Sequence, residues 1–70
     1  METLDLHGIR HRDAERLVEN FVLLNQLPVR IITGNSIEMK SIVQIVLLRY
    51  EMKSDVESHW NLGSLIISEG

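Results

Sequence analysis

A chain of 70 residues with a net charge of −3 is long enough for one domain, which we place at residues 1–70. Its apolar fraction of 44 % excludes a disordered tail, and the absence of cysteine excludes disulfides and thiolate-bound metal. No apolar run approaches the roughly 20 residues that cross a bilayer, and no secretory signal is visible. We therefore expect a cytoplasmic protein with no membrane partner.

The first predicted element is a short strand over residues 3–7. Leucines alternate there with Asp5 and His7, so one face is apolar and the other polar. Gly8 ends the strand. A helix is predicted over 12–25, because its apolar residues recur at helical spacing: Ala14, Leu17, Val18, Phe21, Val22 and Leu24.

Pro28 stops this helix, and the β-branched run at 29–33 predicts a buried strand that ends at Gly34. Asn35 or Ser36 can cap the next helix, and Asn35 with Glu38 resembles a capping box. That helix is predicted over 37–52.

The last elements are a strand over 55–60, with Val56 and Trp60 pointing inward, and a strand over 64–68. The turn between them is predicted at 61–63. The order βαβαββ indicates parallel pairing of the first three strands and a closing hairpin. The predicted fold is a two-layer α/β sandwich, with a mixed four-stranded sheet and two helices on one face.

This topology places polar residues together at one edge of the sheet. If the leucines of 3–7 face the helices, Asp5 and His7 project from the open face at the carboxyl end of the first strand. The second strand ends beside them at Thr33 and Gly34 and leads into a helix N-terminus. Such strand ends favour ligands, and helix N-termini attract phosphate.

The same segments resemble the small MutS-related (Smr) domain family. "LDLHG" at 4–8 is similar to the family's opening strand end, and "RDAERLVENFV" at 12–22 to its first helix. "IITGN" at 31–35 is similar to its second strand and loop, and "NLG" at 61–63 to its final turn. The chain departs from the family at Ser36, where the second loop glycine is expected.

The resemblance implies a fold similar to the C-terminal domain of a bacterial translation initiation factor. It also implies a nuclease or nucleic-acid-binding module acting on DNA or RNA, with Asp5 and His7 at the active strand end. An imidazole can take a proton from water or a ribose 2′-hydroxyl and return one to the leaving oxygen. Asp5 would orient the ring or, alternatively, hold a hard cation such as Mg²⁺ or Mn²⁺. Metal dependence stays open.

A substrate-binding set surrounds this pair. Arg10 and Arg12 follow it directly and are candidates for phosphate contacts, and Arg30 is either a phosphate contact or an ion-pair partner. The full set is Gly8, Arg10, Arg12, Arg30, Thr33, Gly34, Asn35, Ser36 and Lys40.

Two other functions fit the same fold. The mildly acidic net charge and Ser36 favour a nucleic-acid-binding module without catalysis. An interaction domain would instead use an exposed sheet edge or the open face, where Ile32 and Ile66 form a small apolar strip suited to a weak homodimer. We expect this domain to act without a companion domain, and therefore to recognise its substrate itself or through a recruited protein partner.

Overall fold

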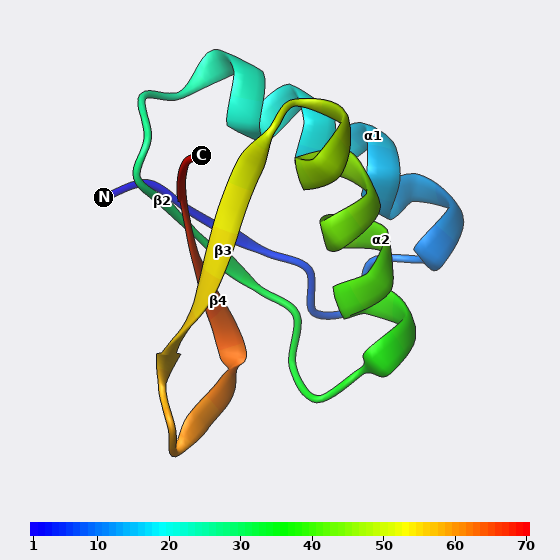
Figure 1. The fold of residues 1–70 in the computed structure, drawn as a ribbon. Coiled ribbons are helices and arrows are strands. Elements are labelled where there is room, and N and C mark those ends of the chain that lie inside the picture. Colours follow the sequence, from blue (N-terminus) through cyan, green and yellow to red (C-terminus); the bar gives the residue numbers. More distant parts are fainter.

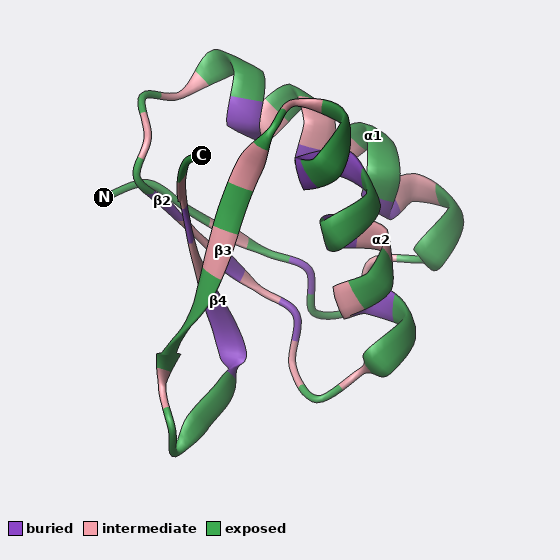
Figure 2. Ribbon diagram, in the orientation of Figure 1, coloured by how far each residue is buried: buried purple, intermediate pink, exposed green.

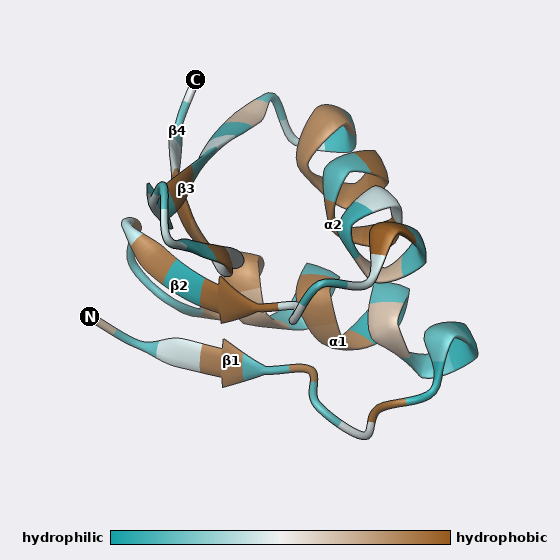
Figure 3. Cartoon of the chain, turned by 90° about the horizontal axis from the view of Figure 1, so that it is seen from below, coloured by the Kyte–Doolittle hydropathy of each residue, from teal (hydrophilic) through white to brown (hydrophobic).

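Six elements follow one another in the computed structural model, which describes all residues 1–70 (Figure 1). They are β1 (Thr3–Asp5), α1 (His11–Leu24), β2 (Val29–Ile32), α2 (Ile37–Arg49), β3 (Met52–Ser58) and β4 (Asn61–Glu69). The strands form one sheet and both helices lie on the same side of it, so the predicted two-layer α/β sandwich is confirmed (Figure 3). No helix is long and apolar enough to span a membrane.

The strand order is β1-β2-β4-β3. β1 and β2 run parallel, whereas β4 is antiparallel to both of its neighbours. The expectation that the first three strands pair in parallel is therefore wrong for β3, which pairs only with β4. The reason is burial: β4 buries Leu65 and Ile67 and suits the centre of the sheet, while β3 has no buried residue and takes the edge.

The core lies between the sheet and the helices, where twelve apolar side chains form one cluster (Figure 2). The sheet contributes Val29 and Ile31 from β2 at 0 % exposure, together with Leu6 just after β1. Fully burying one such side chain contributes about 1.5–3 kcal/mol. The alternate residues of these strands, Asp5 and Arg30 among them, consequently point to the open face of the sheet.

The second half of the chain differs from prediction in its boundaries. The helix expected over 37–52 ends at Arg49, because Glu51 takes a left-handed conformation (φ 55°). The third strand then starts at Met52, three residues earlier than expected. Val56 is 47 % exposed and Trp60 is 80 % exposed, so neither side chain is a core residue.

The hairpin turn also lies elsewhere. Ser58 pairs with Asn61, so the two residues between them, His59 and Trp60, form the turn. Gly63, expected in the turn, is instead a buried residue of β4. In helix α1, Leu24 was expected on the apolar face but is 81 % exposed at the helix end.

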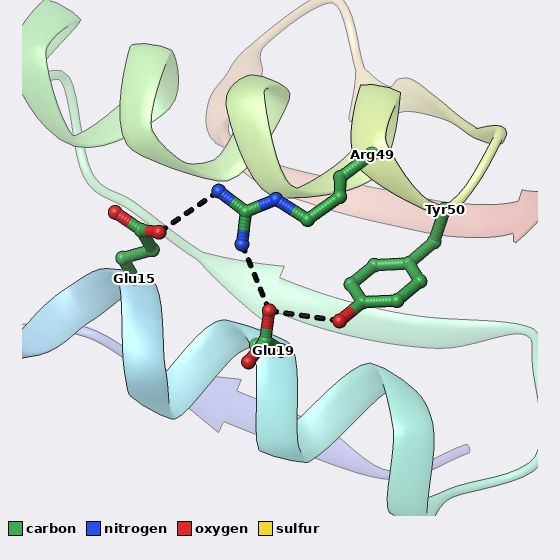
Figure 4. A network of polar contacts seen from close by, with 4 residues as sticks. All are labelled: Glu15, Glu19, Arg49 and Tyr50. Carbon is green, nitrogen blue, oxygen red and sulfur yellow. Dashed lines mark hydrogen bonds and ion pairs between the residues drawn. The ribbon is translucent and has the colours of Figure 1, made fainter.

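A polar cluster joins the outer surfaces of the two helices (Figure 4). Arg49 of α2 donates to Glu15 (2.9 Å) and Glu19 (2.8 Å) of α1, and the Tyr50 hydroxyl donates to Glu19 at 2.8 Å. The Tyr50 hydrogen bond and then Arg49 lower the pKa of Glu19, and the hydrogen bond to Glu19 raises the pKa of Tyr50. We call these four residues the interhelix cluster.

Candidate functional site

Asp5 and His7 lie together at the carboxyl end of β1. Asp5 Oδ1 accepts the backbone N–H of His7 at 2.9 Å and lies 3.7 Å from His7 Nδ1. The side chain of His7 is 79 % exposed and that of Asp5 is 58 % exposed. The carboxylate therefore fixes the backbone at the strand end and stands beside the ring. His7 Nε2 has no hydrogen-bond partner in the protein.

Two glycines with positive φ bring the loop after β2 close to His7. Gly8 (φ 75°) turns the chain away from β1, and Gly34 (φ 66°) turns it away from β2. A Cβ atom built on Gly34 would lie 3.9 Å from His7 Cε1. The imidazole and the Thr33–Gly34 turn are thus neighbours, as the parallel pairing of β1 and β2 requires.

Gly63 of β4 holds this turn in place, a contact that the sequence analysis did not foresee. Its carbonyl accepts the backbone N–H groups of Thr33 (2.8 Å) and Gly34 (3.1 Å), and the Thr33 hydroxyl lies 3.3 Å from it. A Cβ atom on Gly63 would be 2.9 Å from Gly34 Cα. A glycine inside a strand is the signal for such a close backbone approach.

These bonds change the expected role of the turn. The N–H groups of Thr33 and Gly34 point to Gly63, and the Thr33 hydroxyl is buried and donates to the Gly34 carbonyl at 2.9 Å. The free donors are the backbone N–H groups of the following residues, 35–38, which have no acceptor in the protein. Free amides at a helix start are suited to anions.

Ser36 is the N-cap of α2. Its hydroxyl oxygen accepts the Met39 amide at 3.1 Å and donates to Glu38 at 3.3 Å. The capping box expected from Asn35 and Glu38 does not form, because the adjacent Ser36 occupies the capping position. Asn35 is left exposed in the loop.

Arg30 lies on the open face, away from the strand end. It donates to Glu57 of β3 at 2.7 Å and to Thr3 at 3.4 Å, and Ser64 donates to the other oxygen of Glu57 at 2.6 Å. The Ser64 hydrogen bond and then Arg30 lower the pKa of Glu57. Arg30 was expected to be either a phosphate contact or an ion-pair partner, and in the structure it forms an ion pair with Glu57.

The remaining cations of the predicted set lie at the same end of the molecule as His7. In a parallel βα unit each helix begins where its strand ends, so Arg10, Arg12 and Lys40 stand near the starts of α1 and α2. Arg10 and Arg12 are exposed, and none of the three forms an ion pair. The same end also carries the carboxylates of Asp5, Asp13 and Glu38, so this edge holds charges of both signs.

Trp60 is a surface group that the sequence analysis assigned to the core. It stands at the tip of the β3–β4 hairpin, three residues from Gly63, with its ring edge-to-face against His59 at a centroid distance of 4.4 Å. Its 80 % exposure leaves the indole accessible to a planar ligand. The alternating pattern of residues 55–60 suggested that Trp60 is buried. In the structure Trp60 lies in the turn, beyond the last core residue of the hairpin.

The site is an open surface. The molecule has no pocket, and no group of three or more His, Asp or Glu side chains is arranged to hold a metal ion. A hard cation at Asp5 would have one carboxylate and would take its other ligands from water and substrate phosphates. No protein-family model, no curated protein and no solved structure matches the chain.

Proposed function

We propose that this protein is an endonuclease of the small MutS-related (Smr) type that cleaves phosphodiester bonds of DNA or RNA in the cytoplasm. The observation that carries the proposal is the position of His7, exposed beside Asp5 and next to Gly34. An imidazole in such a place reaches a bound phosphate without having to leave a packed interior. The resemblance of "LDLHG" at 4–8 to the family's strand end supports the same assignment.

His7 acts as the proton-transfer group in this proposal. Its unpartnered Nε2 takes the proton from the attacking oxygen, which belongs to water or to a ribose 2′-hydroxyl, and that oxygen bonds to phosphorus. The bond from phosphorus to the leaving oxygen breaks, and His7 Nε2 returns its proton to that oxygen. Asp5, 3.7 Å from Nδ1, stabilises the protonated ring.

Substrate binding falls to the groups around this pair. The free amides of residues 35–38 and the side chains of Arg10, Arg12 and Lys40 contact phosphates, while Trp60 stacks on an unpaired base. Gly8 and Gly34 shape the two loops. Thr33 and Arg30 act indirectly, because the Thr33 hydroxyl and both Nη atoms of Arg30 already bind within the protein.

The residues present fit a metal ion only at a site that the protein shares with the bound substrate. Mg²⁺ commonly binds through one or two carboxylates together with substrate phosphates, and Asp5 supplies one carboxylate. A cation held there would neutralise phosphate charge during the reaction. All other steps of the proposal use His7 and the amide donors.

A cleavage panel tests the proposal. Purified protein is incubated with single-stranded RNA, duplex DNA and branched DNA, with and without Mg²⁺ or Mn²⁺, and compared with His7→Ala and Asp5→Asn. We expect His7→Ala to lose about 10²- to 10⁴-fold in rate and to keep its melting temperature. His11→Ala is the matched control, because it removes another exposed histidine, at the first residue of α1. Equal cleavage by wild type and His7→Ala contradicts the assignment.

A nucleic-acid-binding module without catalysis is the second candidate. It is favoured by the inward-facing amides of Thr33 and Gly34 and by Ser36, which serves as a helix cap. Because Trp60 is the only tryptophan, quenching of its fluorescence reports oligonucleotide binding directly. Salt-dependent quenching with no product under any cation would identify this function, and a recruited partner would then supply the chemistry.

A further inference from the structure

The outer edge of β3 is free. β3 (Met52–Ser58) pairs with β4 on one side only, and the sheet has no strand beyond it (Figure 1). None of its residues is buried. The opposite edge, β1, has only three residues. An exposed strand of this length presents a row of unpaired N–H and C=O groups that a further strand can bind.

We infer that two copies of this chain pair through β3, antiparallel, around a two-fold axis at Ser54. The paired segment is Met52–Val56, because the irregularity between Val56 and Ser58 ends the regular part of the edge. The result is a continuous eight-stranded sheet with all four helices on one side. This inference does not depend on the proposed nuclease function.

Charge complementarity selects this arrangement. Lys53 and Asp55 are exposed and form no ion pair within the chain. They lie on the open face, since their β4 partners Ser68 and Ile66 alternate with buried residues. Around an axis at Ser54, Lys53 of each copy stands opposite Asp55 of the other, which makes two symmetric ion pairs.

The helix side of the same strand is complementary as well. Val56 pairs with the buried Leu65, so it points toward the helix layer, where it is 47 % exposed. In the proposed register Met52 of one copy faces Val56 of the other. Opposite charges therefore meet on one face of the sheet and apolar side chains on the other.

The neighbouring registers that keep both helix layers on the same side match less well. An axis at Asp55 sets the two Asp55 carboxylates against each other and pairs Lys53 only with Glu57, which already binds Arg30 and lies beyond the regular segment. An axis at Lys53 sets the two ammonium groups against each other. Like charges directly opposite destabilise a strand pair. A lysine on an edge strand usually prevents pairing. Here Asp55, two residues away, supplies the counter-charge.

Helix α2 adds apolar surface beside the edge. Gln44 donates to Ser54 at 2.7 Å, so this flank of α2 borders β3. Leu48 lies one helical turn further along the same flank and is 76 % exposed. When the two β3 strands pair, the two α2 helices come to lie side by side, and the Leu48 side chains contribute to the contact between them.

Charge exchange tests the inference by sedimentation or light scattering over a concentration series. Wild type is expected to show a monomer–dimer equilibrium. In Lys53→Asp, positions 53 and 55 are both acidic, and in Asp55→Lys both are lysines. Each variant alone should therefore weaken dimerisation at least about tenfold. An equimolar mixture of the two should form heterodimers, and the double variant should recover wild-type association.

Lys40→Asp makes the same charge change away from β3 and should have no effect on association. Circular dichroism confirms that each variant is folded, and Leu48→Glu weakens the dimer without altering the sheet. Wild type that remains monomeric throughout the series overturns the inference. So does a mixture of the two single variants that associates no better than either alone, which would leave dimerisation to the Ile32 and Ile66 strip or to another surface.

Discussion

The interhelix cluster and the polar groups at the carboxyl end of β1 are held in different ways. In the interhelix cluster, the Arg49 guanidinium, the Tyr50 hydroxyl and two carboxylates bind one another through side chains. At the carboxyl end of β1, the His7 ring makes no hydrogen bond, and its place is set by backbone contacts. A cluster whose groups satisfy one another is suited to stability, whereas one with unsatisfied groups on a fixed backbone is suited to ligands.

The largest effect should come from breaking the backbone support of the site. In Gly63→Ala the new methyl group lies 2.9 Å from Gly34 Cα, and backbone on both sides leaves little room to adjust. We expect the free energy of unfolding to fall by about 1–3 kcal/mol. Amide hydrogen exchange at Thr33 and Gly34 should become faster, because both amides bind the Gly63 carbonyl.

Gly8→Ala provides the matched comparison. The added methyl group would meet no atom within 4 Å, but the backbone at Gly8 has φ 75°. The variant therefore measures the cost of positive φ alone, about 1–2 kcal/mol. It should leave the exchange of the Thr33 and Gly34 amides unchanged. If Gly63→Ala also leaves these amides protected, the Gly63 carbonyl is not what holds the turn.

A smaller effect is expected from the interhelix cluster. Arg49→Met keeps an apolar stem but removes the guanidinium that Glu15 and Glu19 share. The melting temperature should fall by less than in Gly63→Ala, since exposed ion pairs contribute little. Oligonucleotide binding and cleavage should be unchanged, because the cluster lies on the helices, away from His7. A loss of activity in Arg49→Met with normal folding would contradict the separation of the two clusters.

The smallest effect is a dependence of stability on pH. Tyr50 and Arg49 lower the pKa of Glu19 below its ordinary 4.5, so the carboxylate stabilises the folded state above that pH. This stabilisation is lost as the pH falls through the lowered value. Urea unfolding from pH 7 to pH 3 should show the decline, and Glu19→Gln should flatten part of it. Glu57, whose pKa is also lowered, should account for a remaining slope.

The first half of the chain could be predicted from its sequence because its signals are local. Alternation in residues 3–7 placed Asp5 and His7 on the exposed face, although β1 ends at Asp5 and β2 at Ile32, two residues and one residue before the predicted ends. The second half was harder. β3 turns Met52, Ser54 and Val56 toward the helices, a set too weakly apolar to identify the inward face.

The donors of the site depend on contacts that no local pattern contains. The Thr33 and Gly34 amides bind a carbonyl about thirty residues away in β4, and this decides which amides remain free. Trp60 was wrongly expected in the core. A large aromatic residue in an alternating segment suggests burial, but the position of the turn, which the sequence did not reveal, places this residue at the surface. The strand order was missed for the same reason, because β4 lies between β2 and β3 although it follows both in the sequence.

The Gly63 carbonyl makes the hairpin and the loop beside the imidazole one mechanical unit. Three residues of extended chain separate it from Trp60, about 10 Å at the usual rise of a strand. A ligand that contacts the indole at the tip therefore binds the same hairpin whose carbonyl anchors Gly34.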